Sequence, residues 1–133
     1  EIERILDKGF GPTHLKDVVL ANIVEENLLR FDGEKYSLLH WVIMPNHVHL
    51  LFRPTENISL ASIMHSMKSY TANQVNKVMR KSGAFWSIEY FDRYIRNYDH
   101  YVRTVTYIHA NPVKARLCEN ASGWRFGCAR LHE

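Results

Sequence analysis

The stretch that decides the fold is WVIMPNHVHLL, residues 41–51. Apolar runs flank Pro45 and Asn46, and a pair of this kind is typical of a turn. The alternation on either side predicts two antiparallel strands, residues 36–44 and 47–53, with a tight connection between them. We therefore expect an antiparallel sheet to organise the rest of the chain.

The second of these strands has two chemically different faces, because successive side chains of a strand point to opposite sides. The apolar face suits a buried core and consists of Val48, Leu50 and Phe52. The other face carries His47, His49 and Leu51. Two histidines at alternate positions form a compact ligand pair for one cation or one phosphate. A helix across that face would complete a site; without one, the histidines would be half-exposed sheet surface.

Helical spacing of apolar residues predicts a helix before and a helix after this strand pair. The first helix follows Thr13, a typical N-cap residue, and runs to Phe31. The second covers residues 59–82, a segment without any acidic residue. Its cations are Lys68, Lys77, Arg80 and Lys81. One face of this helix should pack, and the other should be basic.

The helix predicted nearest the C-terminus covers Tyr101–Ala110, with Asn97 or Asp99 as its cap. Pro112 is expected to end it, because a proline disfavours helical geometry at the residue before it. Tyr107 and Asn111 are four residues apart and share a helix face, so a metal held by the amide would lie near the phenol. Alternatively, Asn111 is a C-terminal cap and Tyr107 a core aromatic residue.

Three further segments are less regular. Residues 85–95 predict an aromatic strand, and the tail around Trp124 and Phe126 predicts a loop docked on the domain. In residues 1–12 the spacing from Ile2 to Leu6 is helical and is followed by Gly and Pro breakers, so we expect no strand there.

Composition points to an ordinary globular protein. The chain has 133 residues, of which 46% are hydrophobic, 12% aromatic and 23% charged, which predicts one domain over residues 1–133. The longest apolar runs, such as residues 41–44, are too short for a bilayer, and no leader sequence opens the chain, so we expect no membrane partner. Cys118 and Cys128 are too few for a disulfide scaffold or a thiolate metal cage, which favours a cytoplasmic location.

Charge is unevenly distributed along the chain. Residues 1–36 carry eight acidic and five basic residues, whereas residues 37–133 carry six and twelve. The second part is therefore basic, and it is also rich in Tyr and Trp. A nucleic acid, with its phosphates and stackable bases, is the partner that such a composition favours.

Two motifs, residues 41–51 and YIHANPVKA at residues 107–115, together resemble the single-tyrosine HUH transposases, and most closely their REP-associated branch. The likeness extends from about Gly33 to Trp124. It implies a ferredoxin-like or RRM-like α+β fold, in which helices cover an antiparallel sheet. Members of the family usually begin with a central strand, so residues 1–12 are the point where this chain departs from the pattern.

The resemblance also implies residue roles. His47 and His49 would be the HUH metal ligands, Tyr107 the nucleophile, and Asn111 the third ligand, where insertion-sequence relatives have Gln. Tyr101 is the rival nucleophile, but no amide follows it four residues later. The implied cofactor is Mg²⁺ or Mn²⁺.

The implied activity is cleavage and transfer of single-stranded or hairpin DNA through a 5′-phosphotyrosine intermediate. The basic helix face, with Lys114 and Arg116, would follow the DNA. Relatives often act as dimers, so a homodimer is an expected state. The alternatives are a DNA-hairpin binding module without transfer activity and a basic metal-binding domain without nucleic acid. Histidine-triad hydrolases are excluded, because position 51 is Leu.

Overall fold

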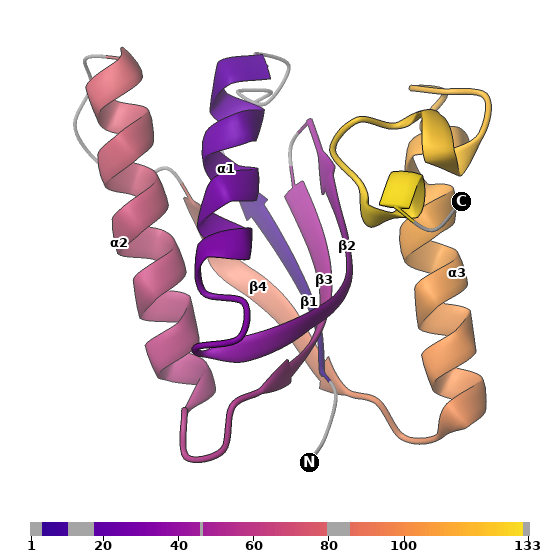
Figure 1. Cartoon of the computed structure of the whole chain (residues 1–133), viewed down its shortest axis with the longest axis horizontal. Helices are drawn as coiled ribbons and strands as arrows, with labels where there is room; N and C mark the ends of the chain where they lie inside the picture. The colour runs from indigo at the N-terminus through magenta and orange to yellow at the C-terminus, as the bar shows by residue number, and fades with distance from the viewer. Residues whose placement is uncertain (1–3, 11–17, 46, 80–85, 132–133) are drawn as a thin grey trace.

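A four-stranded antiparallel sheet forms the centre of the protein. The computed structural model describes residues 4–10, 18–45, 47–79 and 86–131. The strands follow the order β2-β3-β1-β4 across the sheet (Figure 1). They are β1 (Arg4–Phe10), β2 (Tyr36–Met44), β3 (His47–Pro54) and β4 (Trp86–Tyr94). The strand pair predicted on either side of Pro45 is confirmed.

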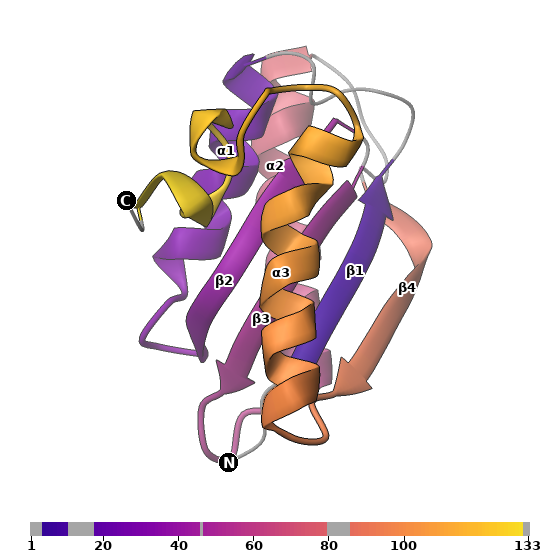
Figure 2. The same cartoon turned by 90° about the vertical axis from the view of Figure 1, so that its right-hand side faces the viewer.

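Helices cover both faces of this sheet. Helices α1 (Val18–Arg30) and α2 (Leu60–Met79) lie on one face, and α3 (Tyr98–Lys114) crosses the other (Figures 1 and 2). Two short 3₁₀ turns follow, η2 (Ala121–Gly123) and η3 (Cys128–Leu131). The predicted α+β fold, with an antiparallel sheet covered by helices, is therefore confirmed. None of the described helices is long and apolar enough to cross a membrane.

The main core lies between the sheet and helices α1 and α2. The predicted apolar face of β3 is buried there, through Val48, Leu50 and Phe52. The amide of Asn27 on α1 donates to the Met67 carbonyl oxygen at 3.2 Å and to the Thr71 hydroxyl, both on α2. This buried polar link holds the two helices together, because leaving the N–H groups of the amide unpaired there would be costly.

A smaller core lies under α3. Ile108 is fully buried against Val42, Met44 and Leu51 of the sheet. This contact anchors the middle of α3 and leaves Tyr107 and His109 on either side of Ile108. The opposite sheet face predicted for the histidines is therefore covered by a helix.

The expectation that residues 1–12 contain no strand is wrong. Strand β1 is central, and it pairs with β3 on one side and with β4 on the other. Its partners lie more than 35 residues away in sequence, so tertiary pairing overrides the weak local pattern. At its first residue, the guanidinium of Arg4 forms an ion pair with Asp92 and lies 4.2 Å from the ring centroid of Tyr94.

Pro112 does not end α3 before its own position, contrary to expectation; it lies inside the helix, which continues to Lys114. After the helix the chain closes: the Leu117 N–H donates to the Pro112 carbonyl oxygen at 2.9 Å, and Arg116 adopts a left-handed φ of 60°. At the other end, Asn97 is the cap, since its side-chain oxygen accepts from the His100 N–H at 2.8 Å.

Other element ends differ from the predictions by a few residues. Helix α2 begins at Leu60 and ends at Met79, and the predicted strand 85–95 is β4, Trp86–Tyr94. The predicted ends of the helices at residues 13–17 and 80–82 lie outside the described residues.

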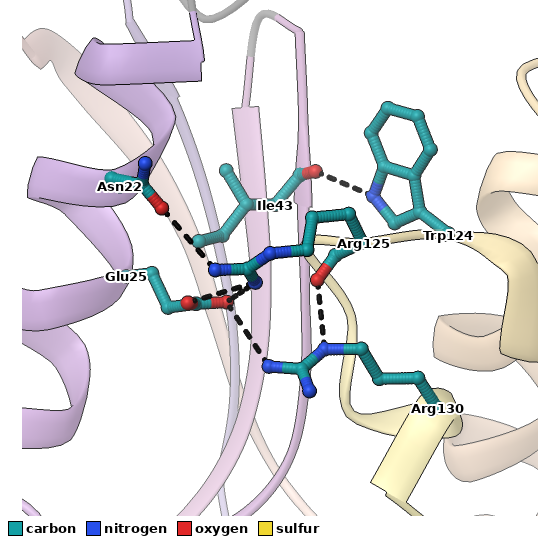
Figure 3. A network of polar contacts seen from close by, with 6 residues as sticks. All are labelled: Asn22, Glu25, Ile43, Trp124, Arg125 and Arg130. Carbon is teal, nitrogen blue, oxygen red and sulfur yellow. Dashed lines mark hydrogen bonds and ion pairs between the residues drawn. The ribbon is translucent and has the colours of Figure 1, made fainter.

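The C-terminal tail docks on the domain, as predicted, and it lies along the edge strand β2. The Ile43 N–H donates to the Phe126 carbonyl oxygen at 2.8 Å, and the Trp124 indole N–H donates to the Ile43 carbonyl oxygen at 3.0 Å. The Arg125 guanidinium holds both oxygens of Glu25 on α1, at 3.0 and 3.2 Å (Figure 3). Arg130 reaches the same carboxylate at 3.9 Å and donates to the Arg125 carbonyl oxygen. The tail therefore connects β2 with α1.

Candidate functional site

Helix α3 brings Tyr107 against the histidine pair of β3. The rings of His47 and His49 meet edge to face, with centroids 4.5 Å apart. The Tyr107 ring lies edge-on to His49, at 5.2 Å between centroids. His49 is 1% exposed and Tyr107 is 45% exposed. The phenol thus rests with its ring on a buried imidazole and remains accessible from solvent.

Asn111 lies one helical turn beyond Tyr107. Helix α3 runs antiparallel to β3 (Figure 2), so a step towards the helix C-terminus is a step towards the start of the strand. Four helical residues rise about 6 Å, and two strand residues rise about 6.6 Å. Asn111 therefore lies from Tyr107 in the direction of the His47 end of β3.

The Asn111 amide nitrogen is engaged within the helix. It donates to the Tyr107 carbonyl oxygen at 3.0 Å, so the side-chain oxygen is the atom that remains for a cation. The predicted alternative of a C-terminal cap does not describe Asn111, because the helix continues to Lys114.

Tyr101, the rival nucleophile, occupies a different place. It lies near the start of α3, half-buried, and its ring is 6.2 Å from that of His40 on β2. Like Leu39 and Ile95, it packs against the small core under α3.

The predicted DNA-contacting cations fall on two sides of the sheet. Lys68 and Lys77 are exposed on α2, which lies on the opposite face of the sheet from α3. Lys114 and Arg116 are exposed at the C-terminal end of α3, on the side of the histidine–tyrosine cluster. Arg80 and Lys81 lie outside the described residues.

A basic and aromatic cavity that was not predicted from the sequence lies at the other end of α3. It has a volume of about 450 Å³ and is lined by Leu39, Arg53, Ile95, Arg96, Asn97, Tyr98 and Tyr101. Burial, followed by the charges of Arg96, Arg103 and Arg93, lowers the pKa of nearby His100. The signal available in the sequence was the density of Arg and Tyr between residues 93 and 103.

A second feature that was not predicted from the sequence is a cluster formed by His40, His109 and Cys128. Their ligand-type atoms all lie within 4.8 Å of one another. His109 belongs to the motif at residues 107–115, but nothing local in the sequence connects it with His40 or Cys128.

The model of the family "Transposase IS200 like" matches residues 17–111. That range is more than half of the chain, so the protein belongs to the IS200-like transposase family, a family of DNA transposases. The predicted resemblance to these transposases is confirmed. Curated proteins provide no significant match.

Solved structures show the same fold at low sequence identity. A REP-associated tyrosine transposase bound to a REP hairpin is 18% identical, with a TM-score of 0.78; the match covers 97% of this chain and 77% of that one. A protein described as a transposase from Deinococcus radiodurans R1 is 19% identical, with a TM-score of 0.55; the match covers 82% of this chain and 88% of that one.

Proposed function

We propose that this protein cleaves single-stranded or hairpin DNA and transfers the strand through a 5′-phosphotyrosine, using a divalent metal. The observation that carries the proposal is the contact between Tyr107 and the histidine pair, with ring centroids 5.2 Å apart at His49. A nucleophile belongs beside the groups that orient the phosphate it attacks.

Tyr107 performs the covalent step. Its hydroxyl oxygen attacks the scissile phosphorus, the bond between phosphorus and tyrosine oxygen forms, and the bond to the 3′-oxygen breaks. The phenolic proton is lost to solvent, and the leaving oxygen takes up a proton to become a 3′-hydroxyl. Because the phosphotyrosyl bond conserves the energy of the linkage, a second 3′-hydroxyl reverses the step without ATP.

His47, His49 and Asn111 are the ligand set that we propose for the metal. Two imidazoles and an amide oxygen suit Mg²⁺ or Mn²⁺, with Mn²⁺ closer to the ligand type. When bound, the cation polarises the scissile phosphate and neutralises its developing charge. The burial of His49 and the engagement of the Asn111 nitrogen fit this role, because both restrict the orientation of the ligand.

For DNA binding, we propose two groups of basic side chains that contact phosphates. Lys114 and Arg116 lie at the end of the helix that carries Tyr107, and they would hold phosphates next to the scissile one. Lys68 and Lys77, with Arg80 and Lys81 further along the sequence, would contact a flanking part of a hairpin that passes round the sheet. A cytoplasmic location and a homodimer remain part of the same proposal.

The proposal is tested by the polarity of the covalent product. Hairpin DNA labelled at its 3′ end, and the same DNA labelled at its 5′ end, are incubated with protein and Mn²⁺ and separated on denaturing gels. A 5′-phosphotyrosine retains the 3′-labelled fragment on the protein and releases the 5′-labelled one. If the hairpin is bound but never cleaved, the protein is the binding module without transfer activity; if it is neither bound nor cleaved, DNA is not the substrate.

A further inference from the structure

A second group of side chains of the metal-ligand type lies on the other side of Ile108 from Tyr107. It joins three parts of the chain: His40 on β2, His109 on α3 and Cys128 at the start of η3. Cys128 is 2% exposed, and both histidines are half-buried. These residues take no part in the proposed DNA chemistry.

The distances between the three ligand atoms match the edges of one tetrahedron. His40 Nδ1 lies 3.1 Å from His109 Nε2, and Cys128 Sγ lies 3.8 and 3.5 Å from these two nitrogens. Tetrahedral zinc, with Zn–N of about 2.05 Å and Zn–S of about 2.3 Å, sets the ligands about 3.3 Å apart for two nitrogens and about 3.6 Å for nitrogen and sulfur. A single ion can therefore reach all three atoms with small adjustments.

A backbone donor lies within hydrogen-bond distance of the sulfur. The backbone N–H of Trp41 donates to Cys128 Sγ at 3.1 Å. A hydrogen bond of this kind stabilises negative charge on sulfur, as outer-shell donors do in metal sites. The tail holds Cys128 at this place through the Ile43–Phe126 backbone bond and the contacts of Arg125.

We propose that His40, His109 and Cys128 form a zinc site with one open coordination position for water. Two imidazoles and one thiolate are typical zinc ligands, and three protein ligands leave the fourth corner of the tetrahedron free. The ion would connect β2, α3 and the C-terminal tail. Since α3 also carries Tyr107 and Asn111, zinc would hold the catalytic helix at a defined position on the sheet.

Cobalt(II) provides a direct test, because a thiolate bound to cobalt gives a charge-transfer band in the near ultraviolet. Untagged protein is titrated with Co²⁺ and then with Zn²⁺ under reducing conditions. We expect one equivalent of Co²⁺ to produce the band, Zn²⁺ to abolish it, and Zn²⁺ to raise the unfolding midpoint by roughly 5 to 10 °C at saturation.

Variants assign the band to the three residues. Cys128→Ser and His109→Gln should lose it while keeping the far-ultraviolet circular dichroism of the wild type, and Cys118→Ser should retain it. His47→Ala should retain it as well, which separates this site from the one proposed for DNA cleavage. The proposal is overturned if wild-type protein gives no thiolate band, if the band survives in Cys128→Ser, or if Zn²⁺ does not abolish it. If Cys128→Ser does not fold, the His109→Gln result decides.

Discussion

The ring of Tyr107 stands edge-on to that of His49, with centroids 5.2 Å apart and planes inclined by 78°. The strand residue is buried and the helix residue is half-exposed, so the contact joins a rigid part of the sheet to a surface that a large substrate can reach. Because Ile108 is locked in the small core beside it, the position of the phenol is set by the fold.

Tyr107→Phe should abolish covalent attachment of DNA, because it removes the attacking oxygen and keeps the ring that packs on His49. Hairpin binding should stay within a few-fold of the wild type, as measured by fluorescence anisotropy. The matched control is Tyr101→Phe on the same helix, which should still form the adduct. If Tyr107→Phe still forms the adduct, Tyr107 is not the nucleophile. If, in addition, Tyr101→Phe loses the adduct, Tyr101 is the nucleophile.

His47→Ala and His49→Ala should each lose DNA cleavage and weaken Mn²⁺ binding, because each removes one of three proposed ligands. Calorimetric titration with Mn²⁺ and a cleavage assay across metal concentrations measure the two effects. His65→Ala is the control, since His65 is exposed on α2. An unchanged metal dependence of cleavage in both variants would remove the ligand assignment.

The sequence predicts those parts of this site that depend on residues close together in the chain. The side of the sheet to which His47 and His49 point could be predicted, because the apolar residues between and after them must face the main core. In the structure, Val48, Leu50 and Phe52 do face that core, and Leu51 faces α3. The role of His40 is different. A register shift between Leu38 and His40 marks a β-bulge in β2, so strict alternation from Tyr36 fails there. Period two counted from Tyr36 would place His40 towards α1 and α2, whereas it meets α3.

Long-range pairing explains the other errors. Strand β1 takes its register from β3 and β4, with Arg4 opposite both Phe52 and Tyr94, and none of these contacts is visible in residues 1–12. Cys128 reaches His40 because the tail pairs with β2 at Ile43, which is 83 positions before Phe126. Such contacts require the three-dimensional fold, since they are set by packing and not by propensity.

Removing cations from the two sides of the sheet should affect DNA binding differently. Each phosphate contact that is lost should make the dependence of log K on log salt concentration shallower by roughly one. We expect the double variant of Lys114→Ala and Arg116→Ala to weaken both binding and cleavage, since Lys114 is the last residue of the helix that carries Tyr107 and Arg116 follows two positions later. The matched double variant of Lys68→Ala and Lys77→Ala should weaken binding alone. Binding that does not vary with salt in the wild type would argue against any phosphate contact.

The free energy of unfolding should fall as the pH is lowered, because His100 becomes protonated more readily in the unfolded chain. Burial, followed by the charges of Arg96, Arg103 and Arg93, lowers the pKa of this ring, and its Nδ1 accepts a hydrogen bond from the Arg96 N–H at 3.0 Å. The folded state therefore holds the neutral ring and binds fewer protons than the unfolded chain, so this stabilisation is present above about pH 6.5 and is lost below it. The difference in unfolding midpoint between wild type and His100→Gln should narrow from about pH 8 to about pH 5. A constant difference would exclude His100 as the titrating group.

Docking of the tail should depend on Glu25, whose carboxylate is almost buried and holds both Arg125 and Arg130. Glu25→Gln keeps the shape of the side chain but removes its charge, and since Arg125 is about half exposed we expect a loss of only about 1 kcal/mol in the free energy of unfolding. Protease cleavage in residues 118–131 should accelerate more than global unfolding does, because the tail loses its attachment to α1 while the sheet keeps its own core. The control is Glu26→Gln, one position further on α1 and exposed, which should leave both measurements unchanged. Equal protection of the tail in the two variants would show that the Trp124 and Phe126 contacts with β2 suffice to hold it.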